Sequence, residues 1–393
     1  MHFETKAVHA GADPDEATSS IAPPIHLSTT FERAPDSQTL HGYSYVREGN
    51  PTQSRLETAL ASIDSGERAL VFGSGIGACS AVLQTLEPGS HVIFPDDSYY
   101  AIRVIARDFF PKWQLTYDLV AMEDLDAVQR AMKPETRMVW AESPSNPLMK
   151  VCDLAALATL AHDRGALFAV DGTFATPALQ RPIEHGADLV IHSMTKYLGG
   201  HSDVAGGAVI FSGGTGALAC RTGAPACPDS GGPLSYTAVE HVRMIIGATA
   251  SPFNSWLVLR GIRTLAARMR VHSENAMRVA EFLSTHPRVE ATHYPGLPSH
   301  PGHEIARRQM SAFSGMVSFR VREGRAAAIE VVSKTKVFLS ATSLGGTESL
   351  IEHRASSEGQ GTTTPENLLR MSVGLEHPDD LVADLDQALR QAS

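Results

Sequence analysis

Short apolar runs alternate with stretches of helical period between residues 69 and 211, and this alternation restricts the folds that the chain can adopt. The runs have the length of buried strands, and they lie at 69–72, 91–94, 138–142, 166–170, 189–191 and 208–211. The helical patterns between them lie at 78–86, 102–110 and 154–164. Such alternation predicts an α/β domain with a mostly parallel sheet, whose ligands bind at the carboxyl ends of the strands.

The segments before and after this region have other patterns. Residues 1–50 contain many breakers and little apolar periodicity, so we expect an arm that packs on the main domain or on another subunit. A helix is predicted at 52–62, where the main domain begins. Residues 212–233 are rich in Gly, Pro and Ala and are predicted to form a loop.

The C-terminal part of the chain predicts a second, smaller domain. One long helix is expected over 255–283, and strands are expected at 315–319 and 369–373. A final amphipathic helix is expected at 379–389. The predicted division is therefore an arm at 1–50, an α/β domain at 51–252 and a C-terminal α/β domain at 253–393.

Charge and cysteine content narrow the class of protein. The formal charge of −10 is spread thinly, without a basic block, so we expect no nucleic-acid or membrane partner and a small-molecule substrate. The four cysteines, Cys79, Cys152, Cys220 and Cys227, are too few and too scattered for a secreted disulfide framework. No apolar run is long enough to span a membrane as a helix. We therefore expect a soluble protein of the cytoplasm.

Two strand ends carry side chains that pyridoxal phosphate requires. Lys196 follows an apolar run and has the hydroxyls of Ser193 and Thr195 beside it. Asp171 closes the preceding apolar run. The amine would form a Schiff base with the cofactor, the hydroxyls would meet its phosphate, and the carboxylate would keep its pyridine nitrogen protonated. A surface lysine and a helix-capping aspartate are the alternatives, but the combination favours an enzyme with this cofactor.

A glycine-rich turn after the first strand has two interpretations. The run from Gly73 to Ala78 opens a helix, and the next strand ends in Asp96, which matches a dinucleotide-binding fingerprint. The same turn would bind any phosphate, because free backbone N–H groups and the helix dipole attract an anion. In that case the amides of Gly75 and Ile76 would hold the phosphate of pyridoxal phosphate.

Three further side chains are candidates for the site. The ring of Tyr99 could lie over a flat pyridine ring, although aromatic side chains more often pack in cores. The amide of Asn146 stands in a turn and could reach a ring hydroxyl. Arg370 interrupts an apolar strand, where it would either bind a substrate carboxylate or form a salt bridge between domains. Cys220 and Cys227 lack a second pair of ligands nearby, so no metal site is predicted.

Several blocks, in one order along nearly the whole chain, resemble the Cys/Met metabolism family of pyridoxal phosphate enzymes, which includes cystathionine γ-synthase and γ-lyase. The most specific block is Ser193-Met-Thr-Lys196-Tyr-Leu-Gly-Gly-His-Ser-Asp203. The other blocks lie at 7–11, 45–52, 142–147, 171–177, 260–265, 343–350 and 370–376. So many blocks are more specific than one glycine motif, and they favour this family over a dinucleotide-binding protein.

The resemblance implies a fold-type I architecture, similar to aspartate aminotransferase, and a homotetramer of active dimers. Lys196 and Tyr99 would be catalytic, the lysine as Schiff-base partner and proton shuttle and the tyrosine as a helper in proton transfer. The cofactor-binding residues that it implies are Lys196, Asp171, Tyr99, Gly75, Ile76, Ser193, Thr195, Asn146, Thr173, Tyr45 and Arg47. The last two would reach the phosphate of the neighbouring subunit. The substrate carboxylate would be held by Arg370, Ser343 and Asn146.

The chain departs from the family pattern at several positions around the expected substrate pocket. Gly172 stands where the family usually has Asn, and Arg354 stands in place of the Pro of a His-Pro-Ala block. Thr342 occupies a position where several cystathionine enzymes have Glu. None of these changes removes a group that the cofactor requires, so we expect them to alter the choice of substrate.

The preferred function is γ-replacement or γ-elimination on an amino acid derived from homoserine or homocysteine. A β-elimination from cystathionine or cysteine would use the same residues and is the first alternative. A non-catalytic oligomer that binds the cofactor is the second.

Overall fold

The computed structural model describes residues 1–213, 234–359 and 362–392, and its centre is a seven-stranded sheet. The strands are β1 (Arg68–Phe72), β2 (His91–Pro95), β3 (Thr116–Val120), β4 (Thr136–Glu142), β5 (Leu167–Asp171), β6 (Leu189–Ser193) and β7 (Gly207–Phe211). Their order across the sheet is β1-β7-β6-β5-β4-β2-β3. Strand β7 alone runs in the direction opposite to the other six strands, so the prediction of a mostly parallel sheet is confirmed.

Helices cover both faces of this sheet, because alternate residues of each strand point to opposite sides. Val71 and Val139 join one apolar cluster, whereas Phe72 and Trp140 join the other. The helices of this part are α2 (Pro51–Ile63), α3 (Gly75–Leu83), α4 (Tyr100–Asp108), α5 (Phe110–Trp113), α6 (Leu125–Ala131), α7 (Leu154–Asp163), α8 (Thr176–Leu179), the 3₁₀ helix η1 (Pro182–His185), α10 (Tyr236–Ile246) and α11 (Pro252–Ile262). Helix α2 confirms the predicted helix at 52–62, with one more residue at each end.

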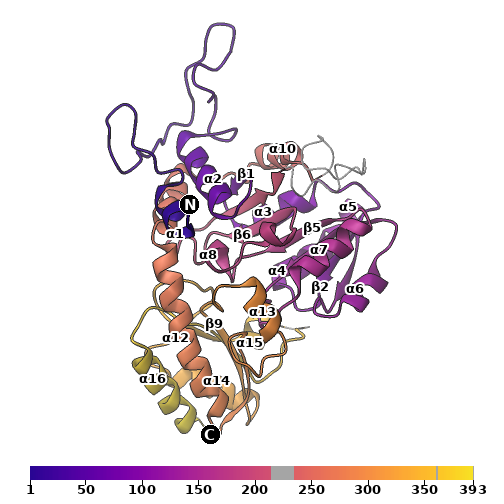
Figure 1. The fold of residues 1–393 in the computed structure, drawn as a ribbon, viewed down its shortest axis with the longest axis vertical. Helices are drawn as coiled ribbons and strands as arrows, with labels where there is room; N and C mark the ends of the chain where they lie inside the picture. Colours follow the sequence, from indigo (N-terminus) through magenta and orange to yellow (C-terminus); the bar gives the residue numbers. More distant parts are fainter. Residues whose placement is uncertain (214–233, 360–361, 393) are drawn as a thin grey trace.

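The second part of the chain folds around a five-stranded sheet (Figure 1). Its strands are β8 (Val289–His293), β9 (Met316–Val321), β10 (Leu339–Ser340), β11 (Leu350–His353) and β12 (Leu368–Ser372), in the order β10-β11-β12-β9-β8. Its helices are α12 (Leu265–Thr285), α13 (His303–Gln309), α14 (Arg325–Lys334), α15 (Arg354–Glu358) and α16 (Pro378–Gln391). A separate apolar cluster begins at Ala276, in the middle of α12. The division of the chain at residue 252 stays a prediction.

The prediction of one helix over 255–283 is wrong, because two helices, α11 and α12, meet at Arg263 and Thr264. The carbonyl of Gly261 accepts hydrogen bonds from the backbone N–H of Thr264 at 3.2 Å and from Nη2 of Arg268 at 2.7 Å. In a continuous helix this carbonyl would accept from the backbone N–H four residues later, so these two donors mark the end of α11. A Cβ on Gly261 would also lie 2.4 Å from the carbonyl oxygens of Leu198 and Gly199, so this bend packs directly against the segment that follows Lys196.

Helix α12 forms hydrogen bonds with both parts of the chain. Nη1 of Arg268 donates to the carbonyl of Tyr197 at 2.8 Å. One turn later, Nδ1 of His272 lies 2.7 Å from the carbonyl oxygen of Val373, just after β12. Figure 1 shows this long helix running through both parts of the chain. One rigid element is therefore bonded beside Lys196 and beside the strand that carries Arg370.

The N-terminal segment projects from the body after the short helix α1 (Phe3–His9), as Figure 1 shows. Its apolar side chains Ile21 and Leu27 are 74% and 68% exposed. That residues 1–50 form an arm that packs on the main domain or on another subunit stays a prediction.

Most of the loop predicted at 212–233, with Cys220 and Cys227, lies outside the described residues. Within the described ranges, no helix combines the length and apolar character that crossing a membrane requires. The same ranges contain no group of three or more His, Cys, Asp or Glu side chains that could hold a metal ion.

Candidate active site

A cavity of about 410 Å³ lies where the carboxyl ends of the large sheet meet the second domain. Its wall contains eleven of the thirteen residues predicted for the site, namely Gly75, Ile76, Tyr99, Asn146, Asp171, Thr173, Ser193, Thr195, Lys196, Ser343 and Arg370. Strand ends supply one side of the wall and the segments around β11 and β12 supply the other. Residues that are far apart in the sequence thus meet at one place, as the rule for parallel sheets predicts.

Lys196 lies three residues beyond the end of β6, and its side chain is half-buried in the cavity. Its Nζ donates to Oγ of Ser343 at 2.7 Å. Desolvation, followed by the positive charge of Arg370, lowers the pKa of Lys196 to about 8. A larger share of this amine is therefore unprotonated near neutral pH than in an exposed lysine, which makes it a better nucleophile.

Asp171 ends β5 beside Lys196, and its neighbour in the next strand is another acid, Glu142, at the end of β4. Asp171 accepts a hydrogen bond from the backbone N–H of Thr173 at 3.0 Å. It forms no ion pair with any residue that the structure describes, and desolvation raises its pKa. A half-buried, desolvated carboxylate of this kind is costly without a cation, and a protonated pyridine nitrogen would supply one.

The first turn of α3 leaves backbone donors for an anion. Oγ of Ser74 accepts from the N–H of Gly77 at 3.1 Å, and the carbonyl of Ser74 accepts from Ala78 at 3.1 Å. In the described parts of the chain, the N–H groups of Gly75 and Ile76 have no hydrogen-bond partner. A Cβ on Gly75 would lie 2.9 Å from Cβ of Ser193, so only glycine fits here. These amides suit a phosphate group.

The hydroxyls on the same side of the cavity have different partners. Oγ1 of Thr173 accepts from the backbone N–H of Ser193 at 2.9 Å. The hydroxyl of Thr195 is bonded to the backbone of Gly206, whose N–H lies 3.1 Å from Oγ1. Thr195 therefore positions the segment between β6 and β7, and it also lines the cavity.

Arg370 is buried in β12 and faces the cavity from the second domain. It donates to Oδ1 of Asn146 at 2.9 Å and to the carbonyl of Ser343 at 3.1 Å. It also pairs with Glu352 of β11. Arg370 thus links the two domains through Asn146 and also lines the cavity. Its two interpretations, as carboxylate binder and as link between domains, are therefore compatible.

Tyr99 begins the approach to α4, where its backbone N–H donates to Oε2 of Glu142 at 2.8 Å. The side chain is 41% exposed on the cavity wall. Desolvation raises the pKa of its phenol, so the hydroxyl holds its proton at neutral pH.

Tyr45 and Arg47 do not line this cavity. They belong to the projecting arm, where Nη1 of Arg47 donates to the carbonyl of Met244 at 3.0 Å and its guanidinium lies 5.5 Å from the ring centre of Tyr45. Their assignment to the cofactor of a neighbouring subunit stays a prediction.

Sequence reasoning did not assign a role to several residues of the wall. Glu142 was detectable, because it closes an apolar strand in the same manner as Asp171. Desolvation and the nearby charge of Asp171 raise its pKa well above the usual range. Arg354 and Glu358 of α15 also line the cavity. The family pattern placed Arg354 around the expected substrate pocket, but no periodicity or motif predicted the ion pairs of this short helix.

The residues present therefore fit pyridoxal phosphate on three independent points. The amine of Lys196 suits its aldehyde, the uncompensated carboxylate of Asp171 suits its protonated nitrogen, and the amides of Gly75 and Ile76 suit its phosphate.

Comparisons with known proteins agree with this geometry. Residues 4–390 match the model of a family described as Cys/Met metabolism PLP-dependent enzyme. The chain is 46% identical over 391 residues to a cystathionine gamma-synthase of Mycobacterium tuberculosis, covering 98% of this chain and 96% of the relative. It is 39% identical over 398 residues to a cystathionine beta-lyase of Coxiella burnetii, covering 99% of this chain and 98% of the relative.

A solved structure has the same fold over the whole chain. The crystal structure of metB from Corynebacterium glutamicum superposes with a TM-score of 0.92 at 37% identity, covering 100% of this chain and 99% of that one. The predicted fold-type I architecture and pyridoxal phosphate cofactor are thereby confirmed, and the dinucleotide-binding interpretation of the glycine turn is not favoured. The chain belongs to the Cys/Met metabolism family of pyridoxal phosphate-dependent enzymes.

Proposed function

We propose that this enzyme catalyses γ-replacement or γ-elimination on an amino acid derived from homoserine or homocysteine, as the names cystathionine γ-synthase and γ-lyase describe. The observation that carries the chemistry is Lys196, whose amine, with a pKa of about 8, points at Ser343 in a cavity shared with Asp171 and Arg370. The preference for γ-chemistry is supported by four relatives named cystathionine gamma-synthase at 45–46% identity, above the 39–40% of those named beta-lyase.

When bound, pyridoxal phosphate supplies an electron sink for breaking a bond at the α-carbon. The protein must then bind the amino acid and move its protons. Arg370 would hold the α-carboxylate, because a planar guanidinium donates two parallel hydrogen bonds to it. Ser343 and Asn146 would complete this contact, since both already touch Arg370.

Proton transfer would centre on two groups. Nζ of Lys196 would accept a proton from the α-carbon and return it further along the substrate, because its lowered pKa lets it exchange protons near neutral pH. The phenol of Tyr99 stays protonated, so it would donate a hydrogen bond or a proton to a leaving group.

The projecting arm supports a proposal about assembly. Its apolar side chains are exposed in the single chain, and burying them would require a second copy. We propose a homotetramer of active dimers in which Tyr45 and Arg47 reach the partner's cofactor phosphate. A cytoplasmic location remains part of this proposal.

Two other functions use the same cavity. A β-elimination on cystathionine or cysteine is supported by the relatives named cystathionine beta-lyase. A non-catalytic oligomer is disfavoured, because Lys196, Asp171, Tyr99 and Arg370 all line the same cavity.

Visible absorption spectra before and after adding O-acetylhomoserine, O-succinylhomoserine or cystathionine, with identification of the keto acid, would test the proposal. We expect the cofactor band to shift with substrate, and the product to be 2-oxobutyrate, or a new thioether when a thiol is added with the homoserine ester. Pyruvate would establish β-chemistry instead, and a spectrum that no amino acid changes would favour the non-catalytic oligomer.

A further inference from the structure

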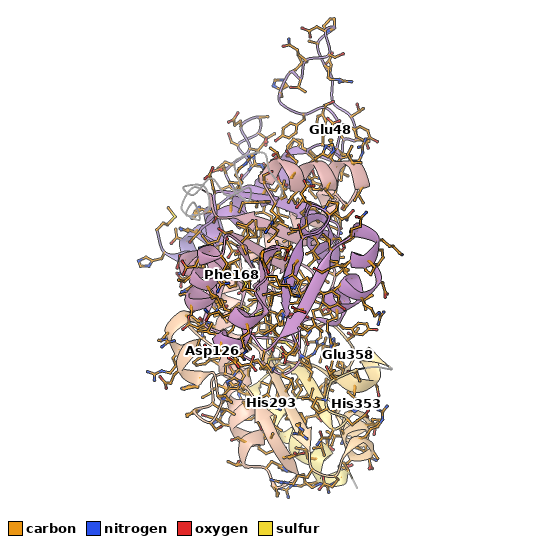
Figure 2. The ribbon with its side chains drawn as sticks, turned by 90° about the vertical axis from the view of Figure 1, so that its right-hand side faces the viewer. Glu48, Asp126, Phe168, His293, His353 and Glu358 are labelled. Atoms are coloured by element: carbon orange, nitrogen blue, oxygen red, sulfur yellow. The ribbon has the colours of Figure 1, made fainter. Side chains whose placement is uncertain are left out.

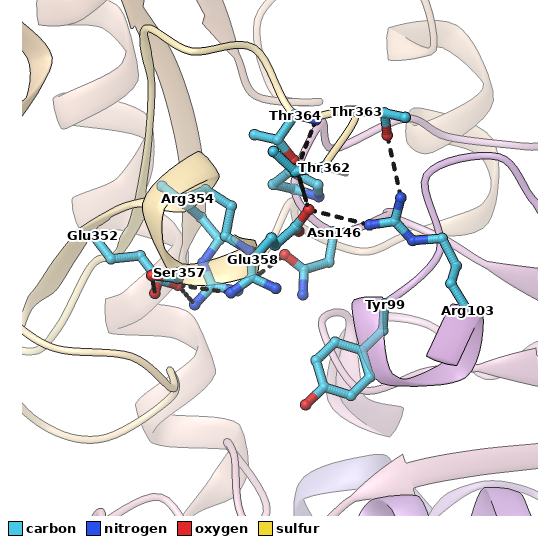
Figure 3. Close-up of polar contacts among 12 residues, drawn as sticks. Tyr99, Arg103, Asn146, Glu352, Arg354, Ser357, Glu358, Thr362, Thr363 and Thr364 are labelled. Atoms are coloured by element: carbon cyan, nitrogen blue, oxygen red, sulfur yellow. Dashed lines mark hydrogen bonds and ion pairs between the residues drawn. The ribbon is translucent and has the colours of Figure 1, made fainter. Parts of the chain in front are cut away.

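The wall of the cavity opposite the large sheet is built from a chain of alternating charges. Arg370 and Nη1 of Arg354 contact the same oxygen of Glu352, the latter at 3.2 Å. Nε of Arg354 contacts Oε1 of Glu358 at 3.2 Å, and Nη2 of Arg103 contacts Oε2 of Glu358 at 3.2 Å. Figure 3 shows Glu358 between Arg354 and Arg103. Figure 2 places Glu358 at the junction of the two domains.

Glu358 accepts from several side chains in this arrangement. Besides the two guanidinium groups, its Oε2 accepts from the hydroxyls of Thr362 at 2.6 Å and Thr364 at 3.2 Å. Glu352 is bonded in the same way, since Oγ of Ser357 donates to its Oε2 at 2.9 Å. Both carboxylates therefore serve to hold arginine side chains.

Arg354 differs from its two carboxylate partners. The side chain is buried, with the whole residue 5% exposed, yet the residue lines the cavity that contains Lys196. Two of its nitrogens, Nε and Nη1, are fixed by Glu358 and Glu352. Its third nitrogen, Nη2, has no hydrogen-bond partner among the residues that the structure describes. A buried guanidinium with one unused donor is suited to an oxyanion.

We propose that Arg354 is a specificity-determining residue that binds a second carboxylate of the substrates, at the end remote from the α-carboxylate. This inference rests on the proposed function, because it concerns the groups that leave or enter at the γ-carbon. Glu352 and Glu358 act as positioning residues that fix the guanidinium before the ligand arrives. The neighbouring Thr342 lines the same cavity without a negative charge that would repel such a ligand.

The second carboxylate has two sources in this chemistry. It belongs either to a dicarboxylic acyl group that leaves, as in O-succinylhomoserine, or to an amino-acid thiol that enters, such as cysteine. Matched substrates without that carboxylate are O-acetylhomoserine for the first case and 2-mercaptoethanol for the second.

The experiment compares kcat/KM for each matched pair in the wild-type enzyme, Arg354→Met and Arg354→Lys. A charge-assisted hydrogen bond to a buried carboxylate predicts that Arg354→Met lowers the preference for the carboxylate-bearing member by about ten- to a hundredfold. Arg354→Lys keeps the charge and should recover part of it. A loss confined to the acyl pair identifies the leaving group, and a loss confined to the thiol pair identifies the nucleophile.

Arg103→Met is the matched control. It removes a guanidinium from the same ion-pair chain, but Arg103 does not line the cavity, so the preference should change less than threefold or so. If Arg354→Met and Arg103→Met reduce kcat/KM equally for both members of each pair, Arg354 only supports the fold and the proposal is wrong.

Two additions keep the test decisive. Removing Arg354 leaves Glu352 and Glu358 undercompensated, so the double variant Arg354→Met/Glu358→Gln is included in case the single variant does not fold. Calorimetric binding of O-succinylhomoserine and O-acetylhomoserine to a Lys196→Ala protein reads the same discrimination without turnover. If no variant or wild-type protein forms product but calorimetry still shows the preference and its loss, the proposed function fails and the role of Arg354 stands.

Discussion

The two walls of the cavity are built on different physical principles. On the large-domain side, Asp171, Ser193 and Lys196 stand at or just after strand ends, and backbone amides of α3 complete the wall. On the other side, the functional groups are held by ion pairs and side-chain hydrogen bonds among Glu352, Arg354 and Glu358. Groups placed by the backbone keep their positions when neighbouring side chains change. Groups held by side-chain contacts can be repositioned by a single substitution. The first wall therefore suits a constant cofactor and the second suits a substrate that varies.

The largest expected effect concerns the wall on the large-domain side. Lys196→Ala removes the nucleophile and the proton carrier together, so turnover should fall by at least about a thousandfold. Some cofactor should remain bound, because Asp171 and the amides of α3 are intact. Steady-state kinetics and the absorbance of the dialysed protein would measure both, and full activity in this variant would refute the assignment of Lys196.

Arg370→Lys tests the point where the two walls touch. Lysine keeps the charge but lacks the planar pair of donors that now contact Asn146 and Ser343. We expect kcat/KM to fall by about a hundredfold, mostly through KM, for all amino-acid substrates alike. A loss that depended on the distal group would instead assign Arg370 to the same role as Arg354.

Gly75→Ala probes the phosphate side of the backbone-built wall. The new Cβ would lie 2.9 Å from Cβ of Ser193, so the first turn of α3 must shift. We expect cofactor affinity to weaken about tenfold, and a loss of about 1–3 kcal/mol in the free energy of unfolding. Fluorescence titration of cofactor-free protein with pyridoxal phosphate would measure the first. Gly89→Ala, whose Cβ would meet nothing within 4 Å but whose φ is +89°, controls for backbone strain without contact to the site.

The smallest effect is a pH dependence that couples the two walls. The folded pKa of Lys196, about 8, lies below its usual value of 10.5, so the unfolded chain binds more protons between these values. This group therefore makes the cofactor-free protein more stable as pH rises from about 8 to 10.5. Uptake of pyridoxal phosphate should accelerate over the pH range centred near 8, because only the neutral amine attacks the aldehyde.

The positive charges of Arg370 and, less strongly, Arg354 contribute to that lowered pKa of Lys196. In Arg354→Met the midpoint of the uptake profile should therefore move to higher pH. Stopped-flow measurement of uptake across the profile would detect this shift. An unchanged midpoint would mean that the two walls act independently on Lys196.

The large sheet, and the strand-end residues that line the cavity, could be predicted from the sequence because both follow from short-range patterns. Buried strands such as 138–142 and 208–211 are continuous apolar runs, and the residues that end them must gather at one edge. The bend between α11 and α12 was not predictable, since it depends on the contact of Gly261 with the segment after Lys196. The role of α15 was missed for a similar reason. Its charges are paired with residues such as Arg103, which is 255 positions away in the chain.

Two hydrogen bonds of α12 hold the cavity in its shape before a substrate binds. Arg268 holds the segment of Lys196, and His272 on the same helix holds the end of the strand of Arg370. One turn of α12, rather than a loop, therefore sets the separation between the segment of Lys196 and the strand of Arg370. We therefore expect the separation of these two contacts to change little when an amino acid binds, which leaves free energy of binding for selecting among distal groups.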